Sequence, residues 1–223
     1  MTIAENIAGL RARIAAAAER SGRDPASVRL IGASSASKGV TEAMVREAIA
    51  AGLLDFGENF VQEAAGRMTP LGGLADKATW HFIGHLQTNK AAQALRYFSV
   101  IQSVDSLRLA EHLSRRATVP VRILLEVNVA GEASKYGLAP DEVSVAVNTV
   151  CKLPNLELTG LMTMAPAVDD AELVRPVFRE LRELARANGL SELSMGMTDD
   201  FEVAVEEGAT MVRLGRAIFG ERP

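Results

Sequence analysis

Met211-Val-Arg-Leu-Gly-Arg-Ala-Ile-Phe-Gly220 has the pattern of a short buried strand that ends at a glycine, with a single arginine, Arg213, inside it. The segment before it, Ser194-Met-Gly-Met-Thr-Asp-Asp200, follows the same plan of a strand end followed by small residues. Small residues leave backbone N–H groups accessible, and such groups beside one fixed cation suit a phosphate group. The two segments therefore predict two strand ends beside an anionic ligand.

Outward from these segments, short apolar runs alternate with amphipathic stretches along the whole chain. The expected strands are 29–34, 54–57, 80–83, 100–104, 121–127, 156–162, 192–195 and 210–214. The expected helices are 42–51, 61–68, 90–97, 107–117, 141–152, 170–187 and 201–207, after an N-terminal helix that starts with a capping box at Thr2 and Glu5.

This alternation predicts a parallel α/β fold. We expect one domain, residues 1–223, closed into a single (β/α)8 TIM-type barrel, because that fold takes about 200 to 400 residues. An open doubly wound sheet is the alternative, since periodicity alone does not separate the two.

Composition disfavours several classes of protein. With 48% apolar residues the chain can bury a large core, and its net charge of −4 and 4% aromatic content argue against a nucleic-acid partner. No run reaches the ~20 apolar residues of a membrane span, and we expect a soluble cytoplasmic protein. The single cysteine, Cys151, lies in an apolar helical stretch that predicts a buried, unreactive thiol. The three histidines show no metal-ligand spacing, so no metal is expected.

Polar residues gather where the expected strands end, which in a parallel barrel is where the site lies. Lys38 follows the first strand, and an amine buried there would have a lowered pKa and a lone pair free to attack an aldehyde. A solvated loop lysine is the alternative for Lys38 taken alone. Asn59 follows the second strand and could orient a ring oxygen, or simply cap a turn. His81, inside an apolar strand, is expected to be a satisfied core residue.

Arg213 at the end of the last strand could point a permanent cation at a heteroaromatic nitrogen. Because a guanidinium donates hydrogen bonds and accepts none, it would keep a pyridine nitrogen unprotonated. The alternative is an ion pair with Asp199, Asp200 or Glu202. Thr198 and the backbone amides around Gly215 form the expected phosphate cradle.

Six segments together resemble the YggS/PROSC family of pyridoxal phosphate homeostasis proteins. They span nearly the whole chain, at 56–63, 80–90, 132–137, 158–164, 193–200 and 211–220. The resemblance implies a barrel like the N-terminal domain of bacterial alanine racemase, a PLP fold-type III barrel without the C-terminal β domain. It also implies that pyridoxal 5'-phosphate (PLP) is held as an internal aldimine. The implied role is intracellular PLP homeostasis, with storage or delivery of the cofactor and an influence on amino- and keto-acid balance.

The resemblance also implies site residues by position. Lys38 corresponds to the aldimine lysine, Asn59 lies near the ring and Arg213 faces the pyridine nitrogen. The remaining implied cofactor-binding residues are Ser194, Met197, Thr198 and Gly215, of which the last three lie around the phosphate.

The approach to the lysine departs from the family pattern. Family members reach it through a short run resembling Leu-Val-Ala-Val-Ser-Lys-Thr, whereas here Leu30-Ile-Gly-Ala-Ser-Ser-Ala-Ser-Lys38 is longer and Gly39 replaces the threonine. Lys38 keeps the family spacing to Phe56, whereas a rigid alignment from Leu30 would put Ser35 in its place. We favour Lys38, with the extra residues absorbed as a bulge.

We expect no catalytic residues and no enzymatic activity, because no acid/base set is evident. A PLP-dependent amino-acid racemase is the main alternative, although neither Tyr97 nor Tyr136 lies in a racemase-like context. An aldolase-type enzyme with Lys38 as its amine is a third hypothesis. The expected partners are PLP and apo forms of PLP-dependent enzymes, and the family points to a monomer.

Overall fold

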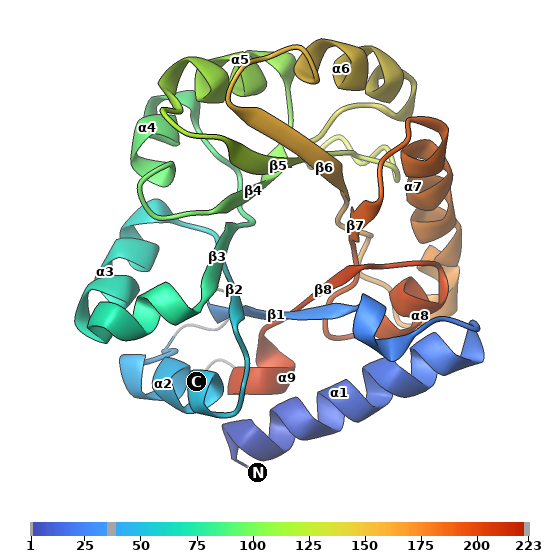
Figure 1. Cartoon of the computed structure of the whole chain (residues 1–223). Helices are drawn as coiled ribbons and strands as arrows, with labels where there is room; N and C mark the ends of the chain where they lie inside the picture. The colour runs from blue at the N-terminus through green and yellow to red at the C-terminus, as the bar shows by residue number, and fades with distance from the viewer. Residues whose placement is uncertain (1, 35–38, 221–223) are drawn as a thin grey trace.

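Eight parallel strands form a closed barrel in the computed structural model, which describes residues 2–34 and 39–220 (Figure 1). Strands adjacent in sequence are adjacent in the barrel, and β1 pairs with β8 to close it. The strands are β1 (Arg29–Ala33), β2 (Asp55–Glu58), β3 (Thr79–Phe82), β4 (Val100–Val104), β5 (Val121–Glu126), β6 (Leu156–Met162), β7 (Glu192–Ser194) and β8 (Met211–Leu214). The expected (β/α)8 barrel is confirmed, and the open sheet is excluded.

Helices surround the barrel and cover its outer face (Figure 1). They are α1 (Ile3–Arg20), α2 (Glu42–Ala50), α3 (Val61–Leu71), α4 (Ala91–Ala94), α5 (Leu107–Arg116), α6 (Val143–Val150), α7 (Arg175–Ala187), α8 (Phe201–Glu206) and α9 (Arg216–Phe219). Short 3-10 helices lie at η1 (Pro25–Ser27), η3 (Gly72–Lys77), η4 (Thr88–Lys90), η5 (Pro140–Glu142) and η6 (Ala171–Val174).

The N-terminal helix α1 begins with the expected capping box. The Thr2 hydroxyl accepts the Glu5 N–H at 3.2 Å, and the Glu5 carboxylate accepts the Thr2 N–H at 2.7 Å. Its buried stripe packs on α8, α2 and α9 and consists of Ile3, Ile7, Leu10, Ile14, Ala17 and Ala18. Helix α9 has only four residues, and α1 lies across the outer side of the barrel near β1 (Figure 1).

The structure corrects three local expectations. Helix α4 covers only Ala91–Ala94, with a turn after it, and α9 is too short to show a helical period in the sequence. Cys151 is exposed rather than buried. Val150 faces the core, and the next residue lies about 100° further round the helix axis, which turns Cys151 outward.

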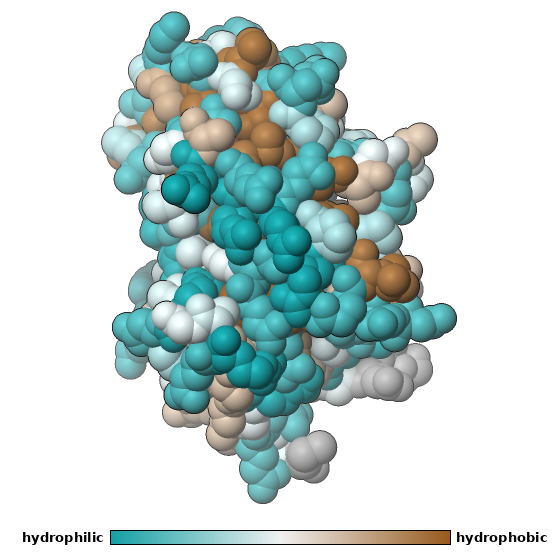
Figure 2. Space-filling model, turned by 90° about the vertical axis from the view of Figure 1, so that its right-hand side faces the viewer, coloured by the Kyte–Doolittle hydropathy of each residue, from teal (hydrophilic) through white to brown (hydrophobic). Residues whose placement is uncertain are grey.

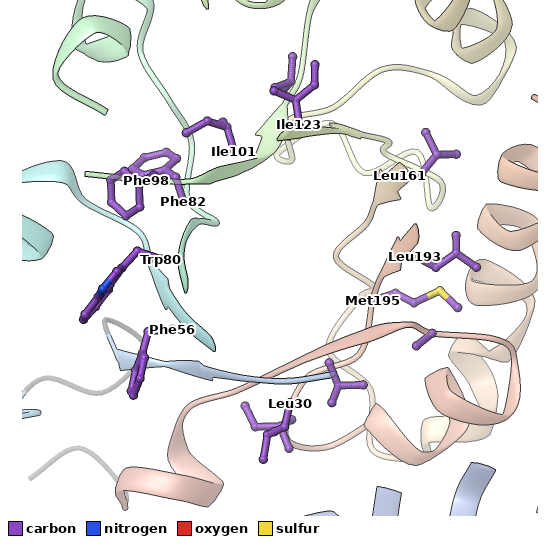
Figure 3. Close-up of a cluster of buried hydrophobic side chains, with 14 of the residues drawn as sticks. Leu30, Phe56, Trp80, Phe82, Phe98, Ile101, Ile123, Leu161, Leu193 and Met195 are labelled. Atoms are coloured by element: carbon purple, nitrogen blue, oxygen red, sulfur yellow. The ribbon is translucent and has the colours of Figure 1, made fainter. Parts of the chain in front are cut away.

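Side chains alternate between the helix layer and the barrel interior along each strand. Those that point outward form the large core drawn in Figure 3, where the Phe56 and Trp80 rings stack with centroids 5.2 Å apart. Inside the barrel a smaller apolar cluster consists of Ile31, Val100, Leu124, Met162 and Met211. Polar side chains occupy the rest of the interior, and they position the site.

The outer surface over α7 carries charged groups that bind one another. Figure 2 views this side of the molecule and shows a broad hydrophilic band. The Glu207 carboxylate contacts the guanidinium groups of Arg175, Arg179 and Arg182 at 3.2, 3.0 and 2.9 Å. These ion pairs join α7 to the end of α8.

Candidate functional site

The last strands of the barrel bring four polar groups to its mouth. Ser194 ends β7, Glu126 ends β5 and Thr163 directly follows β6, while Arg213 lies one residue before the end of β8. Because all strands are parallel, their C-terminal ends lie at the same face of the barrel.

Arg213 is a buried cation held by hydrogen bonds to neutral groups. Its Nη1 donates to the Ser194 hydroxyl at 2.6 Å, and its Nη2 donates to the Thr163 carbonyl at 2.9 Å. Burial lowers the pKa of Arg213 to about 10, against the opposing effect of Glu126 and Asp200, so it remains charged at neutral pH. Among the described residues it forms no ion pair within 4 Å.

The carboxylates that were the alternative partners of Arg213 lie elsewhere. Asp199 pairs with Arg216 at 2.6 Å and Glu202 pairs with Arg13 at 3.0 Å. Asp200 accepts the backbone N–H of Met197 at 2.6 Å and acts on Arg213 only at longer range.

A chain of hydrogen bonds runs from Arg213 through the barrel interior to the opposite end. The Ser194 hydroxyl donates to Gln102 Oε1 at 2.6 Å, and Gln102 Nε2 lies 2.9 Å from Nδ1 of His81. Nε2 of His81 lies 2.9 Å from the carboxylate of Asp55, the first residue of β2. These four links, which include the Arg213–Ser194 bond, form the interior donor chain.

The two ends of this chain fix its direction. Arg213 can only donate and the carboxylate of Asp55 accepts, so each group between them accepts from one neighbour and donates to the next. Burial lowers the pKa of His81, although Asp55 opposes the shift, so the ring is neutral and carries its proton on Nε2. Aligned bonds of this kind strengthen one another. The expectation of a satisfied core histidine is consistent with these contacts.

The loop after β7 approaches its neighbours closely. Gly196 has φ +94°, and a Cβ there would lie 2.7 Å from the Cβ of Ala204, so only glycine fits. Thr198 is half-buried in the turn that follows, while the Met197 side chain is 36% exposed. Gly215 is buried and precedes α9, whose first N–H groups have no acceptor within the helix.

The second strand places Asn59 at the mouth and its neighbour Glu58 away from it. Asn59 is half-buried against Gly84, where a Cβ would lie 2.4 Å from the Asn59 carbonyl. Glu58 is fully buried and accepts from the Ser34 hydroxyl at 2.5 Å and from Arg67 Nε at 2.8 Å. These contacts make Glu58 part of a structural ion pair. Lys38 lies outside the described residues.

A pocket of about 540 Å³ opens at the mouth beside these groups. Its lining includes Asn59, Phe60, His85, Glu126 and Tyr136. The His85 and Tyr136 rings stack with centroids 3.6 Å apart, and His85 Nδ1 lies 2.9 Å from a carboxylate oxygen of Asp105.

Some groups at the mouth were given no role from the sequence. Gln102 is a fully buried polar residue in the apolar strand 100–104, and that contrast was the available signal. Glu126 and Thr163 follow strands five and six in the sequence, but nothing local shows what they contact. Lys135 donates to the Ala165 carbonyl at 3.0 Å and pairs with Glu132 at 2.7 Å.

Within residues 2–34 and 39–220, no three His, Cys, Asp or Glu side chains are grouped to hold a metal ion. No helix in the same ranges has the length and apolar character needed to cross a membrane.

Comparison with known proteins gives consistent matches over almost the whole chain. The family model described as "Alanine racemase, N-terminal domain" matches residues 6–223. The Pseudomonas aeruginosa protein named "Pyridoxal phosphate homeostasis protein" is 47% identical over 226 residues, covering 99% of this chain and 96% of that protein.

Solved structures share the fold. PipY of Synechococcus elongatus with PLP bound is 37% identical with a TM-score of 0.82, covering 98% of this chain and all of that one. Alanine racemase from Corynebacterium glutamicum has a TM-score of 0.70 at 19% identity, over 99% of this chain and 60% of that one. The racemase likeness therefore concerns the barrel alone.

Proposed function

The chain belongs to the pyridoxal phosphate homeostasis protein family, and from that premise we propose that it binds PLP at the barrel mouth and takes part in controlling its supply. The binding unit is the one barrel domain, residues 1–223. The relatives with this name match the chain over nearly its full length, and a relative of known structure holds PLP.

The observation that carries the proposal is the buried, oriented guanidinium of Arg213. Of its five N–H groups, one goes to Ser194 and one to Thr163, which leaves three (5 − 2) for a ligand. A pyridine nitrogen is an acceptor of the required kind, and Arg213 would hold it unprotonated. An unprotonated ring withdraws electrons weakly, which suits storage of the cofactor better than chemistry at Cα of an amino acid.

The neighbouring residues fit the other end of the cofactor. Thr198 offers a hydroxyl, and the first-turn amides that follow Gly215 offer N–H donors for the phosphate. The Met197 N–H donates to Asp200, so Met197 helps to bind the phosphate by fixing the turn that carries Thr198. Ser194 acts by fixing Arg213, and Asn59 borders the ring from β2.

Bound PLP supplies an aldehyde that reacts reversibly with primary amines, and we propose Lys38 as the amine that holds it. Its spacing to the motif at 56–59 supports this choice. Reversible attachment allows storage and later delivery to apo forms of PLP-dependent enzymes.

The protein is further proposed to be a monomer, to act in the cytoplasm and to have no turnover of its own. Its relatives are named for homeostasis rather than for an enzymatic reaction, and the racemases share only the barrel. Sedimentation, cell fractionation and assays of Cα deuterium exchange on alanine test these three points.

Borohydride trapping tests the binding proposal. Protein incubated with PLP should absorb in the visible range, and reduction followed by peptide mapping should place the cofactor on Lys38. Lys38→Ala should lose the label, whereas Lys77→Ala, an exposed lysine on η3, should keep it. A protein that takes up no PLP would refute the proposed function, and a label on a different lysine would refute the role of Lys38.

A further inference from the structure

Glu126 is a buried carboxylate that faces the pocket at the mouth, and residues 2–34 and 39–220 give it no partner. It is 4% exposed and lies at the end of β5, where it lines the pocket. Its side chain forms no hydrogen bond or ion pair with any residue that the structure describes. A buried carboxylate is costly unless a donor or a cation accompanies it, so this one is suited to receive a group from a ligand.

The charges around Glu126 indicate that the group is a cation. A second carboxylate, Asp105, acts on Glu126 by repulsion, and its side chain is only 11% exposed beside His85. Arg213 attracts Glu126 from a distance, but its bonds go to Ser194 and Thr163. Burial and the repulsion from Asp105 outweigh that attraction and raise the pKa of Glu126 to about 7. An anion such as phosphate is therefore unfavourable at this end of the pocket.

The pocket walls indicate what the cation is attached to. Phe60, Ile83, Tyr136 and Met164 line the space beside Glu126 and suit an alkyl chain. A divalent metal ion does not fit, because the described residues offer no group of three ligands. A free α-amino acid is also disfavoured. Its carboxylate carbon is two bonds from the ammonium nitrogen, so the carboxylate would be repelled by Glu126 and Asp105.

We propose that this pocket binds a primary ammonium group on an unbranched alkyl chain, as a lysine side chain presents it, with Glu126 as the group that receives the ammonium. The binding is non-covalent and requires only the pocket, without bound PLP. Its biological meaning rests on the proposed function: a recipient enzyme that holds PLP through a lysine would present such a side chain next to the stored cofactor.

Calorimetric titration of the cofactor-free protein tests the proposal. Nα-acetyl-L-lysine amide is the probe, and Nα-acetyl-L-norleucine amide, which has a methyl group in place of the ammonium, is its matched control. At pH 8 the lysine probe should bind at least tenfold more tightly than the norleucine probe. Glu126→Gln should remove that preference, whereas Glu157→Gln, an exposed glutamate at the opposite end of the barrel on β6, should keep it.

The pH dependence gives an independent signature. With a pKa of about 7, Glu126 is ionised in roughly one molecule in eleven at pH 6 and ten in eleven at pH 8. Because only the ionised form receives the ammonium, the lysine probe should bind about tenfold more weakly at pH 6. Lys90 lines the same pocket, and Asp105 with His85, Arg213, and the pair of Glu132 with Lys135 also surround the mouth. Any pH dependence that they cause will persist in Glu126→Gln, so the proposal concerns the part that this substitution abolishes.

Equal binding of the two probes, or an unchanged preference in a folded Glu126→Gln protein, would overturn the proposal. L-alanine binding more tightly than the lysine probe would also overturn it. Circular dichroism of the variant confirms that it is folded. If PLP loading succeeds and the lysine probe fails, only this inference falls; if loading fails and the probe binds, only the proposed function falls.

Discussion

Two glutamates in this protein are buried to the same extent and have opposite surroundings. Glu207, 5% exposed on the outer face, contacts three arginines at 2.9 to 3.2 Å. Glu126, 4% exposed at the barrel mouth, has no such contact among the described residues. Burial raises the pKa of both carboxyls, but the arginines outweigh it at Glu207, whose pKa is lowered, whereas the pKa of Glu126 rises to about 7.

The difference separates charges that hold the fold from charges kept for a ligand. On the outer face Glu207 is neutralised by the neighbouring arginines, so this network requires no ligand to balance its charge. At the mouth Arg213 and Glu126 are buried and close enough to influence each other, yet the part of the chain that the structure describes gives neither of them a counter-ion in direct contact. Sites that bind ligands keep such groups at some cost in stability.

The largest effect is expected for Glu126→Gln, which removes the buried charge. A folded-state pKa raised above the unfolded value means that stability is present at low pH and is lost as the pH rises through about 7. Glutamine does not titrate, so the free energy of unfolding of the variant, relative to that of the wild type, should rise by about 2 to 3 kcal/mol between pH 5 and pH 8. Urea unfolding at both pH values measures this, and a constant difference would contradict it.

Arg213→Met should separate binding from stability. The affinity for PLP should fall about 30-fold, equivalent to about 2 kcal/mol, because a charged hydrogen bond to the ring is lost. The free energy of unfolding should change by less than about 1 kcal/mol, since an apolar side chain avoids the burial of a charge. Fluorescence titration and urea unfolding check the two values. Arg122→Met, at the other end of the barrel, is the matched control and should bind PLP normally.

Glu207→Gln should show the reverse pattern. The three arginines lose their common carboxylate, and the free energy of unfolding should fall by about 1 to 2 kcal/mol, a modest value because the arginines are partly exposed. PLP affinity should not change. Glu202→Gln, which removes an exposed pair with Arg13, should cost less than about 0.5 kcal/mol. A loss of PLP binding in Glu207→Gln would show that the two regions are not separate.

The smallest effect is expected for Asp55→Ala, at the far end of the interior donor chain. Its side chain is 23% exposed, so water can replace the carboxylate as acceptor for His81. PLP affinity should fall about threefold, because the chain still orients Arg213 but with a weaker final acceptor. Titration with PLP measures this, with the exposed Asp76→Ala as control. An affinity for PLP as low as that of Arg213→Met would contradict the assignment of Asp55 as only the final acceptor of the interior donor chain.

The sequence allowed the barrel and the location of the mouth to be predicted because both follow from local patterns. Alternating apolar runs fixed the strand positions to within one or two residues, and Arg213 stood out as a charge inside an apolar strand. The interior donor chain was not predictable. Gln102 on β4 meets Ser194 on β7 across the barrel, and only closure of the sheet brings them together.

The same limit applies to buried charges and to helix edges. Nothing in the sequence near Glu126 or Glu207 shows that Glu207 contacts three arginines whereas Glu126 has no partner within residues 2–34 and 39–220. Cys151 was mispredicted because one residue decides which side of a helix is buried near its end. The role of Lys38 remains a proposal, because it lies outside the described residues.

A crystal structure of the protein with PLP tests the account most directly, through the distance between the Arg213 guanidinium and the pyridine nitrogen. The account predicts a hydrogen bond of about 2.7 to 3.2 Å, with the Ser194, Gln102 and His81 links intact. A ring whose nitrogen lies against Glu126 instead, or an Arg213 side chain turned away from the nitrogen, would contradict it.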